Sequence, residues 1–128
     1  MATGNFVLDK GYRAAGALTK FRAVKFSAAE TVTPVTAITD QIAGIVQFGV
    51  TSTELSKGKG ALVRVMGQSE MEASAAIAVG AAVSAGTDGR AKTAATGERV
   101  VGLCVGHPAT NAGDRITVRL VVGGALSP

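Results

Sequence analysis

The chain has 128 residues, of which 47% are hydrophobic, and a formal net charge of +4 from 13 basic and 9 acidic side chains. This length fits one domain that buries roughly two-thirds of the surface of its unfolded chain. A single cysteine excludes a fold held by intramolecular disulfides. No uninterrupted apolar segment resembles a secretory signal or is long enough to span a bilayer. We therefore expect a soluble protein, made in the cytoplasm, with no membrane partner.

Aromatic residues are few and unevenly placed. The chain has no Trp, one Tyr and four Phe, and four of these five aromatic residues lie within the first 26 positions. Phe48 is the fifth. The rest of the chain must pack small and β-branched side chains, which suits closely spaced strands and disfavours a large ligand cavity.

The positive charge is concentrated at the N-terminal end. Residues 1–29 carry five basic side chains and one acidic side chain, whereas residues 30–128 carry eight of each. Residues 1–20 also contain three glycines and show neither a helical nor a strand period. We therefore predict an extended basic N-terminal arm over residues 1–29. Such an arm can bind an acidic protein surface or nucleic acid, or it can remain a solvated tail.

The first half of the chain predicts several short strands. Residues 20–26 form the first, and residues 31–38 form an edge strand or an extended loop because Pro34 cannot donate to a ladder. Residues 42–50 alternate in polarity as a strand does, and so do residues 61–67. The polar segment between them, residues 51–60, is expected to be a loop.

The second half continues this pattern. Residues 69–78 suggest a strand followed by a single helical turn. Residues 81–94 predict a hairpin around Thr87-Asp88-Gly89, because Gly accepts positive φ. The last two strands are expected at residues 100–105 and 115–122.

Taken together, these elements predict an all-β fold, a small antiparallel β-barrel or β-sandwich with an extended N-terminal arm. The expected β-domain covers residues 30–122, and residues 123–128 are expected to form a flexible C-terminal tail.

Two parts of the sequence resemble each other. Residues 42–45, a polar loop and residues 62–65 parallel residues 100–103, a loop and residues 117–120. The first pair of segments is 58 positions apart and the second pair is 55. A duplicated strand–loop–strand unit explains this similarity, and so does chance in a chain rich in Val and Gly.

Residue types that carry chemistry are sparse. Cys104 and His107 would point to opposite faces of a strand, which does not suit a nucleophile and its base. One Cys and one His cannot close a tetrahedral metal site, and the carboxylates come no closer in sequence than Glu70 and Glu72. Gly58-Lys59-Gly60 lacks the surrounding pattern of a phosphate loop. We predict no catalytic residue, no metal site and no cofactor, and therefore no enzyme.

The basic segment also interleaves cations with rings. Phe21 and Phe26 alternate with Lys20, Arg22 and Lys25, as in proteins that stack single-stranded bases on aromatic side chains. The same residues suit rings that anchor in the groove of a protein partner while the cations meet an acidic rim. Because residues 30–128 are neutral, a broad nucleic-acid-binding face is disfavoured and no specific nucleic acid is expected.

From about residue 40 onward, an ordered series of short motifs is similar to one family. The series runs GALVRVMGQSE (60–70), AIAVG (76–80), TDG (87–89), VVGLCVG (100–106), AGD (112–114) and ITVRLV (116–121). In this order it resembles the capsid cement, or head decoration, proteins of tailed bacteriophages.

This resemblance implies a non-enzymatic structural protein on the outer capsid surface of a virion. Its partners would be the major capsid protein, whose subunits it would bridge and stabilise, and neighbouring copies of itself, since relatives are often trimers. It would be synthesised in the host cytoplasm. The alternatives are a phage tail-fibre or other virion binding module, or a nucleic-acid-binding β-domain with a basic arm. The expected capsid contacts lie in the arm: Lys10, Arg13, Lys20, Phe21, Arg22, Lys25 and Phe26.

Overall fold

A computed structural model describes residues 7–37 and 40–120 of the chain. Short strands dominate the described residues, and one short helix interrupts them. The elements are β1 (Leu8–Ala14), β2 (Ala23–Ala28), β3 (Thr31–Pro34), β4 (Gly44–Val46), α1 (Ser52–Ser56), β5 (Ala61–Met66), β6 (Gln68–Glu72), β7 (Ala82–Ala85), β8 (Ala91–Thr93), β9 (Val100–Cys104) and β10 (Arg115–Leu120).

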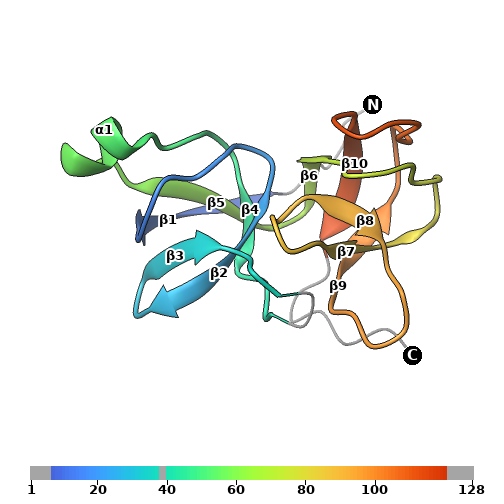
Figure 1. The fold of residues 1–128 in the computed structure, drawn as a ribbon, viewed down its shortest axis with the longest axis horizontal. Helices are drawn as coiled ribbons and strands as arrows, with labels where there is room; N and C mark the ends of the chain where they lie inside the picture. The colour runs from blue at the N-terminus through green and yellow to red at the C-terminus, as the bar shows by residue number, and fades with distance from the viewer. Residues whose placement is uncertain (1–6, 38–39, 121–128) are drawn as a thin grey trace.

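The strands form two sheets that lie side by side (Figure 1). The first sheet is a closed barrel with the strand order β1-β3-β2-β4-β5, and the second has the order β6-β10-β9-β7-β8. The predicted all-β fold with a barrel is confirmed. One strand pair departs from the antiparallel expectation, because β1 and β3 are parallel.

The wall between the two sheets is buried on both faces. Val24 and Val46 belong to the core inside the barrel, whereas their neighbours Ala23 and Ile45 belong to the core of the second sheet. Successive side chains of a strand point to opposite faces, so β2 and β4 serve both cores. The two sheets therefore form one packed body with a shared wall.

The second sheet repeats the pairing of the barrel. Val24 of β2 pairs with Gly44 of β4, and Val83 of β7 pairs with Gly102 of β9. Along the chain, Val24 and Val83 are 59 positions apart, and Gly44 and Gly102 are 58 positions apart. We call residues 8–66 the barrel unit and residues 68–120 the second unit.

The repeat extends to the last strand of each unit. Ile45 lies opposite Arg64 in the barrel unit, and Leu103 lies opposite Arg119 in the second unit. Along the chain, Ile45 and Leu103 are 58 positions apart, and Arg64 and Arg119 are 55 positions apart. These are the spacings of the similarity between residues 42–65 and 100–120. Of the two explanations that the sequence left open, the structure therefore supports duplication.

Close backbone approach explains why both units have glycine at this position. A Cβ on Gly44 would lie 2.4 Å from the carbonyl oxygen of Arg64, and a Cβ on Gly102 would lie 2.0 Å from that of Arg119. Both distances are far shorter than real contacts of a Cβ atom. Each unit therefore requires glycine where β4 lies against β5 and where β9 lies against β10.

The two units differ in how they close. In the barrel, β1 and β3 pair in parallel at Arg13–Thr31 and Ala14–Val32. In the second unit, the corresponding contact is the single parallel bridge between Ala73 and Ala91. The second sheet is thus a version of the same barrel that is largely open, because the chain next to its edge strand β6 meets β8 only at this bridge.

The expectation of an extended arm needs correction from Leu8 onward. Residues 8–14 and 23–28 are barrel strands, and the expected boundary at residue 30 falls in the turn between β2 and β3. The reason is that β1 has no fully buried residue, so its sequence shows little apolar alternation. Residues 1–6 of the expected arm and the expected tail, residues 123–128, lie outside the described residues.

Several predicted elements are shifted or altered. The strand expected over residues 42–50 is limited to β4, and no helical turn follows β6. The expected loop at residues 51–60 contains α1, because Thr51 and Glu54 form a capping box. The predicted hairpin at residues 81–94 is confirmed as β7 and β8, which pair from Ala85–Ala91 to Val83–Thr93.

Candidate functional site

The residues expected at a partner surface separate into two groups. Lys10 and Arg13 lie on β1 and Phe26 on β2, away from the second unit, whereas Lys20, Phe21 and Arg22 lie beside the junction of the two units. Lys25 of β2 faces the β3–β4 connection instead. The structure therefore does not bring all seven residues together into one patch.

The barrel group is centred on an aromatic pair. The rings of Tyr12 and Phe26 pack edge to face with their centroids 5.2 Å apart, and Lys10 Nζ lies 5.3 Å from the centroid of Tyr12. In register, Tyr12 lies opposite buried Ala61, and Phe26 lies opposite buried Val32. Cross-strand neighbours share a face, so both rings lie on the faces of their strands that point into the barrel, at its rim. Half of Phe26 remains exposed.

Tyr12 was missed in the sequence analysis. Its signal was its position two residues after Lys10, because residues i and i+2 of a strand share a face.

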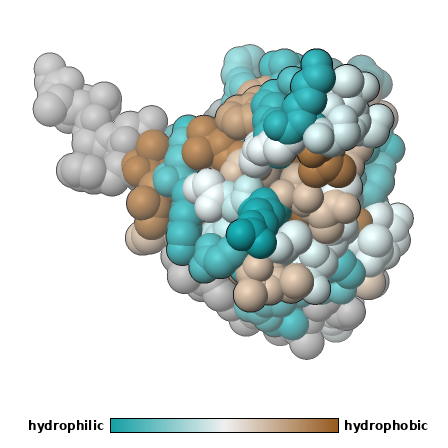
Figure 2. Space-filling model, turned by 90° about the vertical axis from the view of Figure 1, so that its left-hand side faces the viewer, coloured by the Kyte–Doolittle hydropathy of each residue, from teal (hydrophilic) through white to brown (hydrophobic). Residues whose placement is uncertain are grey.

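An open groove of about 320 Å³ lies beside this pair, between β1 and the connection that carries α1. One wall is Tyr12, Arg13 and Ala14, and the other is Leu55 with residues 58–60. Figure 2 faces the end of the molecule where Figure 1 places α1 and β1, and hydrophilic and apolar residues lie intermixed on it.

Lys59 is the cation on the loop side of this groove. Its Nζ donates to Glu54 Oε2 at 2.9 Å and to the carbonyl oxygen of Gly49 at 3.2 Å, and it lies 4.8 Å from the centroid of the Phe48 ring. The sequence had predicted only a polar loop over residues 51–60, with no phosphate-loop pattern around this lysine. The contacts instead hold its ammonium group beside Phe48, Gly49 and Glu54.

The junction group holds the two units in place. Phe21 has its ring 5.6 Å from Lys20 Nζ and 4.7 Å from the guanidinium carbon of Arg115, which begins β10. Its carbonyl oxygen accepts a hydrogen bond of 2.9 Å from the backbone N–H of Glu72. These contacts join the barrel to two strands of the second unit.

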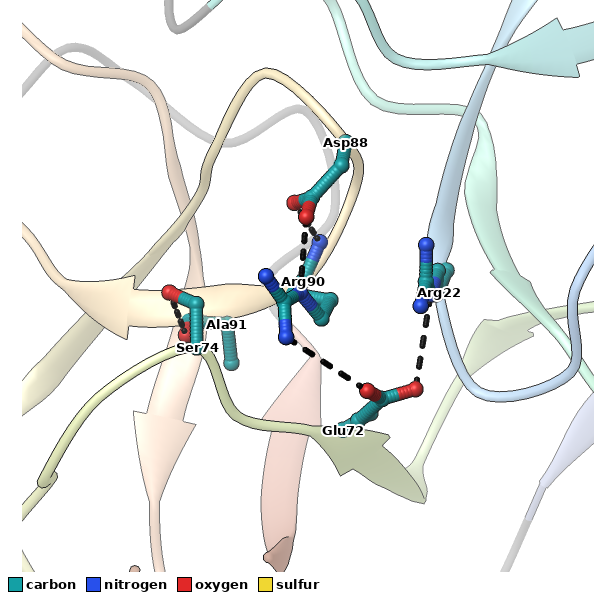
Figure 3. Close-up of polar contacts among 6 residues, drawn as sticks. All are labelled: Arg22, Glu72, Ser74, Asp88, Arg90 and Ala91. Atoms are coloured by element: carbon teal, nitrogen blue, oxygen red, sulfur yellow. Dashed lines mark hydrogen bonds and ion pairs between the residues drawn. The ribbon is translucent and has the colours of Figure 1, made fainter. Parts of the chain in front are cut away.

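An ion-pair network spans the same junction (Figure 3). Arg22 Nε donates to Glu72 Oε1 at 3.4 Å, and Arg90 Nη1 lies 3.7 Å from Glu72 Oε2. Arg90 Nε also donates to Asp88 Oδ2 at 2.7 Å. Burial raises the pKa of Asp88, but the hydrogen bonds from Arg90 outweigh it and the pKa is lowered. Arg22 is therefore engaged within the protein.

Lys25 is similarly engaged. Its Nζ lies 3.0 Å from Asp40 Oδ2 and donates to Thr36 Oγ1 at 2.7 Å. Among the seven expected contact residues, the cations with freer side chains are Lys10, Arg13 and Lys20. Within residues 7–37 and 40–120, no ion pair of Arg13 or Lys20 is found. Lys10 Nζ lies 3.8 Å from Glu30 Oε2, and both side chains are exposed.

The buried carboxylate of Glu98 is explained by the fold of the second unit. Hydrogen bonds from Lys92 Nζ at 2.5 Å, Ala95 N at 2.8 Å and Ser84 Oγ at 3.0 Å satisfy it. These bonds, the one from Lys92 first, lower the pKa of Glu98. Its surroundings therefore describe a satisfied structural charge.

Cys104 and His107 do not form a nucleophilic pair. Cys104 is buried, burial raises the pKa of its thiol, and Sγ contacts the backbone oxygen of His107 at 3.6 Å. In the part of the chain that the structure describes, no three His, Cys, Asp or Glu side chains are placed to hold a metal ion. No helix within that part has the length and apolarity needed to cross a membrane.

Comparisons with known proteins now add to this geometry. A family model described as phage cement protein matches residues 1–120. No curated protein matches the chain. Among solved structures, the chain is similar to the N base of the head fiber gp8.5 of bacteriophage phi29, with a TM-score of 0.70 and 18% sequence identity. The similarity covers 94% of this chain and 98% of that one, and at this identity it shows a shared fold.

Proposed function

The chain belongs to the phage cement protein family, and we propose that it binds the outer surface of an assembled capsid and stabilises the shell by bridging major capsid protein subunits. The family resemblance drawn from the sequence is confirmed, and the protein is a structural component of a phage virion. In this proposal its action is mechanical and needs no cofactor. Neighbouring copies assemble as homotrimers on the capsid.

The observation that supports this proposal most strongly is the charge of the barrel surface. Residues 1–65 carry eight basic and four acidic side chains, whereas residues 66–128 carry five of each. Among the seven expected contact residues, Lys10, Arg13 and Lys20 have the freer cations, and Lys10 lies over the Tyr12 ring that packs against exposed Phe26. Cations next to an aromatic anchor suit a protein partner with an acidic rim.

A capsid offers many copies of such a partner. Each contact can be modest, because a trimer that seats several barrels at once converts weak contacts into lasting attachment. The closed barrel also leaves few unpaired strand edges there, so we assign the contacts to side chains rather than to added strands.

The test is co-sedimentation of the purified protein with mature capsids that lack it, followed by electron microscopy. We expect binding that weakens with rising salt, and density on the outer capsid surface. Arg13→Gln should weaken binding, whereas Arg119→Gln, an equally exposed strand arginine in the second unit, should leave it within about twofold. Absence of wild-type protein from the capsid pellet at low salt would reject the proposal.

The same samples test the rival nucleic-acid function. A mobility-shift assay with duplex DNA should show little affinity at physiological salt. Tighter binding to free DNA than to capsids, with a steep dependence on salt, would support the rival and overturn the capsid proposal.

A further inference from the structure

We propose that copies of the chain assemble head to tail, with the outer face of β7 and β9 in one copy packed on the rim of the barrel unit in the next. We call these surfaces the Leu103 face, formed by Ala82 and Leu103, and the Phe26 rim, formed by Tyr12 and Phe26. This inference rests on the proposed function and identifies the contact that would hold its homotrimer together.

The junction inside the chain is the template for this contact. There Ala23 of β2 and Ile45 of β4 lie in one buried cluster with Met71 of β6 and Ala85 of β7. The exposed fraction of each of these four side chains is 2% or less. The barrel unit thus presents a wall of β2 and β4, and the second unit covers it.

The second unit presents the same wall, but this one stays exposed in the described part of the chain. Ala82 and Leu103 correspond to Ala23 and Ile45, because Ala82 lies opposite Leu103 as Ala23 lies opposite Ile45. Ile45 is 0% exposed, whereas Leu103 is 40% exposed. The Leu103 face is therefore the counterpart of a covered surface.

The rim of the barrel unit is uncovered in the same way. Tyr12 corresponds to Met71 by their strand partners in β5 and β10, and Phe26 corresponds to Ala85 by their partners in β3 and β8. Met71 and Ala85 are buried at the junction, whereas half of Phe26 is exposed. The barrel thus carries its aromatic pair where the second unit carries side chains that a neighbouring unit buries.

The two exposed surfaces are therefore the two halves of the junction. A Leu103 face seated on the Phe26 rim of a second copy removes apolar surface of both from water. The occupant is a second copy rather than the capsid because, inside the chain, a wall of this kind is covered by a unit of the same fold. A contact between two different surfaces can close into a ring, and the proposed homotrimer is such a ring.

The contact between copies differs from the internal junction in its backbone bonds. At the junction, residues 21–23 of the barrel accept a hydrogen bond of 2.9 Å from the N–H of Glu72 and donate one of 2.8 Å to the carbonyl oxygen of Gly89. The counterparts of Glu72 and Gly89 are Arg13 and Glu30, which bond directly to each other at 2.8 Å. The contact between copies therefore relies on side chains, so we expect it to be reversible in solution and lasting on a capsid that seats several copies.

The first experiment traps the contact with a disulfide, without capsids. Phe26→Cys and Leu103→Cys are made as separate variants, each with Cys104→Ala, so that every chain has one thiol. The two are mixed, oxidised mildly and run on a non-reducing gel. We expect linked pairs of chains in the mixture and few in either variant alone, because a disulfide needs Cα atoms within about 7 Å of each other. No linked pairs in the mixture, or an equal yield from one variant alone, would overturn the inference.

Met66→Cys in the same background is the matched control. Met66 is 48% exposed, but it lies opposite Leu8 at the start of β1, away from Tyr12. Mixed with Leu103→Cys, it should give far fewer linked pairs than Phe26→Cys. Equal yields would show random collision and contradict the assigned contact.

A charge placed on the same face tests the contact without added cysteines. Leu103→Glu should abolish the association of wild-type chains in sedimentation velocity at high protein concentration, because it buries an unpaired carboxylate. Met66→Glu should leave that association within about twofold. Both positions are exposed, and unchanged urea denaturation establishes that the variants are folded. Wild-type chains that do not associate, or that associate equally with Leu103→Glu, would contradict the inference.

Capsid binding separates this inference from the proposed function. The inference assigns Phe26 to the contact between copies and leaves Lys10, Arg13 and Lys20 to the capsid. Leu103→Glu should lower the capsid affinity about tenfold or more, because single copies lose the gain from joint seating. Disulfides between positions 26 and 103 without any capsid binding by the wild type would refute the proposed function and leave the contact standing. Normal capsid binding by Leu103→Glu would refute the contact as the basis of the trimer.

Discussion

Phe21 occupies a position where the repeated unit uses glycine. Its φ is +62°, and its counterpart Gly80 has φ +90°. The backbone N–H of Phe21 donates to Val46 O, as that of Gly80 donates to Cys104 O. A left-handed conformation costs a non-glycine residue about 1–2 kcal/mol. The barrel unit retains Phe here, and its ring contacts Arg115 of the second unit.

Gly102 gives a prediction at the same scale. The Cβ of Gly102→Ala would lie 2.0 Å from the backbone oxygen of Arg119, which cannot move without disturbing the β9–β10 ladder. We expect a loss of about 3 kcal/mol in the free energy of unfolding, as in severe overpacking of a core. Urea denaturation followed by circular dichroism measures this change.

Gly11→Ala is the matched control. Gly11 also lies within a strand, but no atom lies within 4 Å of its Cβ position, so its substitution should change the free energy of unfolding by less than about 1 kcal/mol. A destabilisation by Gly102→Ala as small as the control would contradict the close approach of the two strands.

At the scale of elements, one carboxylate organises the connection between β3 and β4. Asp40 Oδ2 accepts backbone hydrogen bonds from Thr36 at 3.0 Å and Ala37 at 2.9 Å, and it pairs with Lys25 of β2. The bond from Thr36 makes the largest contribution, and together these contacts lower the pKa of Asp40 to about 2. The connection is thereby fastened to the barrel.

This lowered pKa predicts a dependence of stability on pH. Because the folded pKa is below the ordinary value of 3.8, the stabilisation by Asp40 is complete above about pH 4 and is lost as the pH falls towards 2. Asp40→Asn should lower the free energy of unfolding by about 1 kcal/mol at pH 6. The difference from wild type should shrink between pH 4 and pH 2 in urea titrations.

Glu30→Gln serves as its control. Glu30 is exposed and reaches Lys10 only at 3.8 Å, so its substitution should change stability by less than about 0.5 kcal/mol. A constant difference between Asp40→Asn and wild type from pH 6 to pH 2 would count against the assigned role of Asp40.

At the scale of the whole molecule, the two units share a core. Ala23, Val35 and Ile45 of the barrel unit pack with Met71 and Ile116 of the second unit, and all five side chains are buried. Exposure of a buried Val or Ile costs roughly 1.5–3 kcal/mol. That loss is large beside the stability of a barrel of this size.

We therefore expect the barrel unit not to fold by itself. A fragment of residues 1–66 should give poorly dispersed amide resonances by NMR, whereas the full chain should unfold in one cooperative transition. A dispersed spectrum of the fragment, or two separate transitions of the full chain, would show that the units are independent.

Part of this structure follows from local sequence. The hairpin of β7 and β8 was predicted because Asp88-Gly89 permits a tight turn, and β5 was predicted because apolar residues alternate over residues 61–65. The expectation of a phage cement protein came from the order of short motifs. These signals depend on chain geometry and on sequence order, which a single sequence displays.

β1 could not be predicted in the same way. Its strand pairing comes from β3 and β5, which are distant in sequence, and none of its side chains is fully buried. Helix α1 was missed because its capping box lies in a polar segment without an apolar stripe.

Composition and local pattern were enough to predict an all-β fold of small side chains with an excess of positive charge near the N-terminus. They could not predict which of those cations pair with carboxylates and which face outward. Arg22 and Lys25 meet carboxylates from residues 72 and 40, whereas Arg13 lines a groove. The physical reason is that an ion pair depends on distance in space, and here the partners are brought together by strand pairing between distant segments.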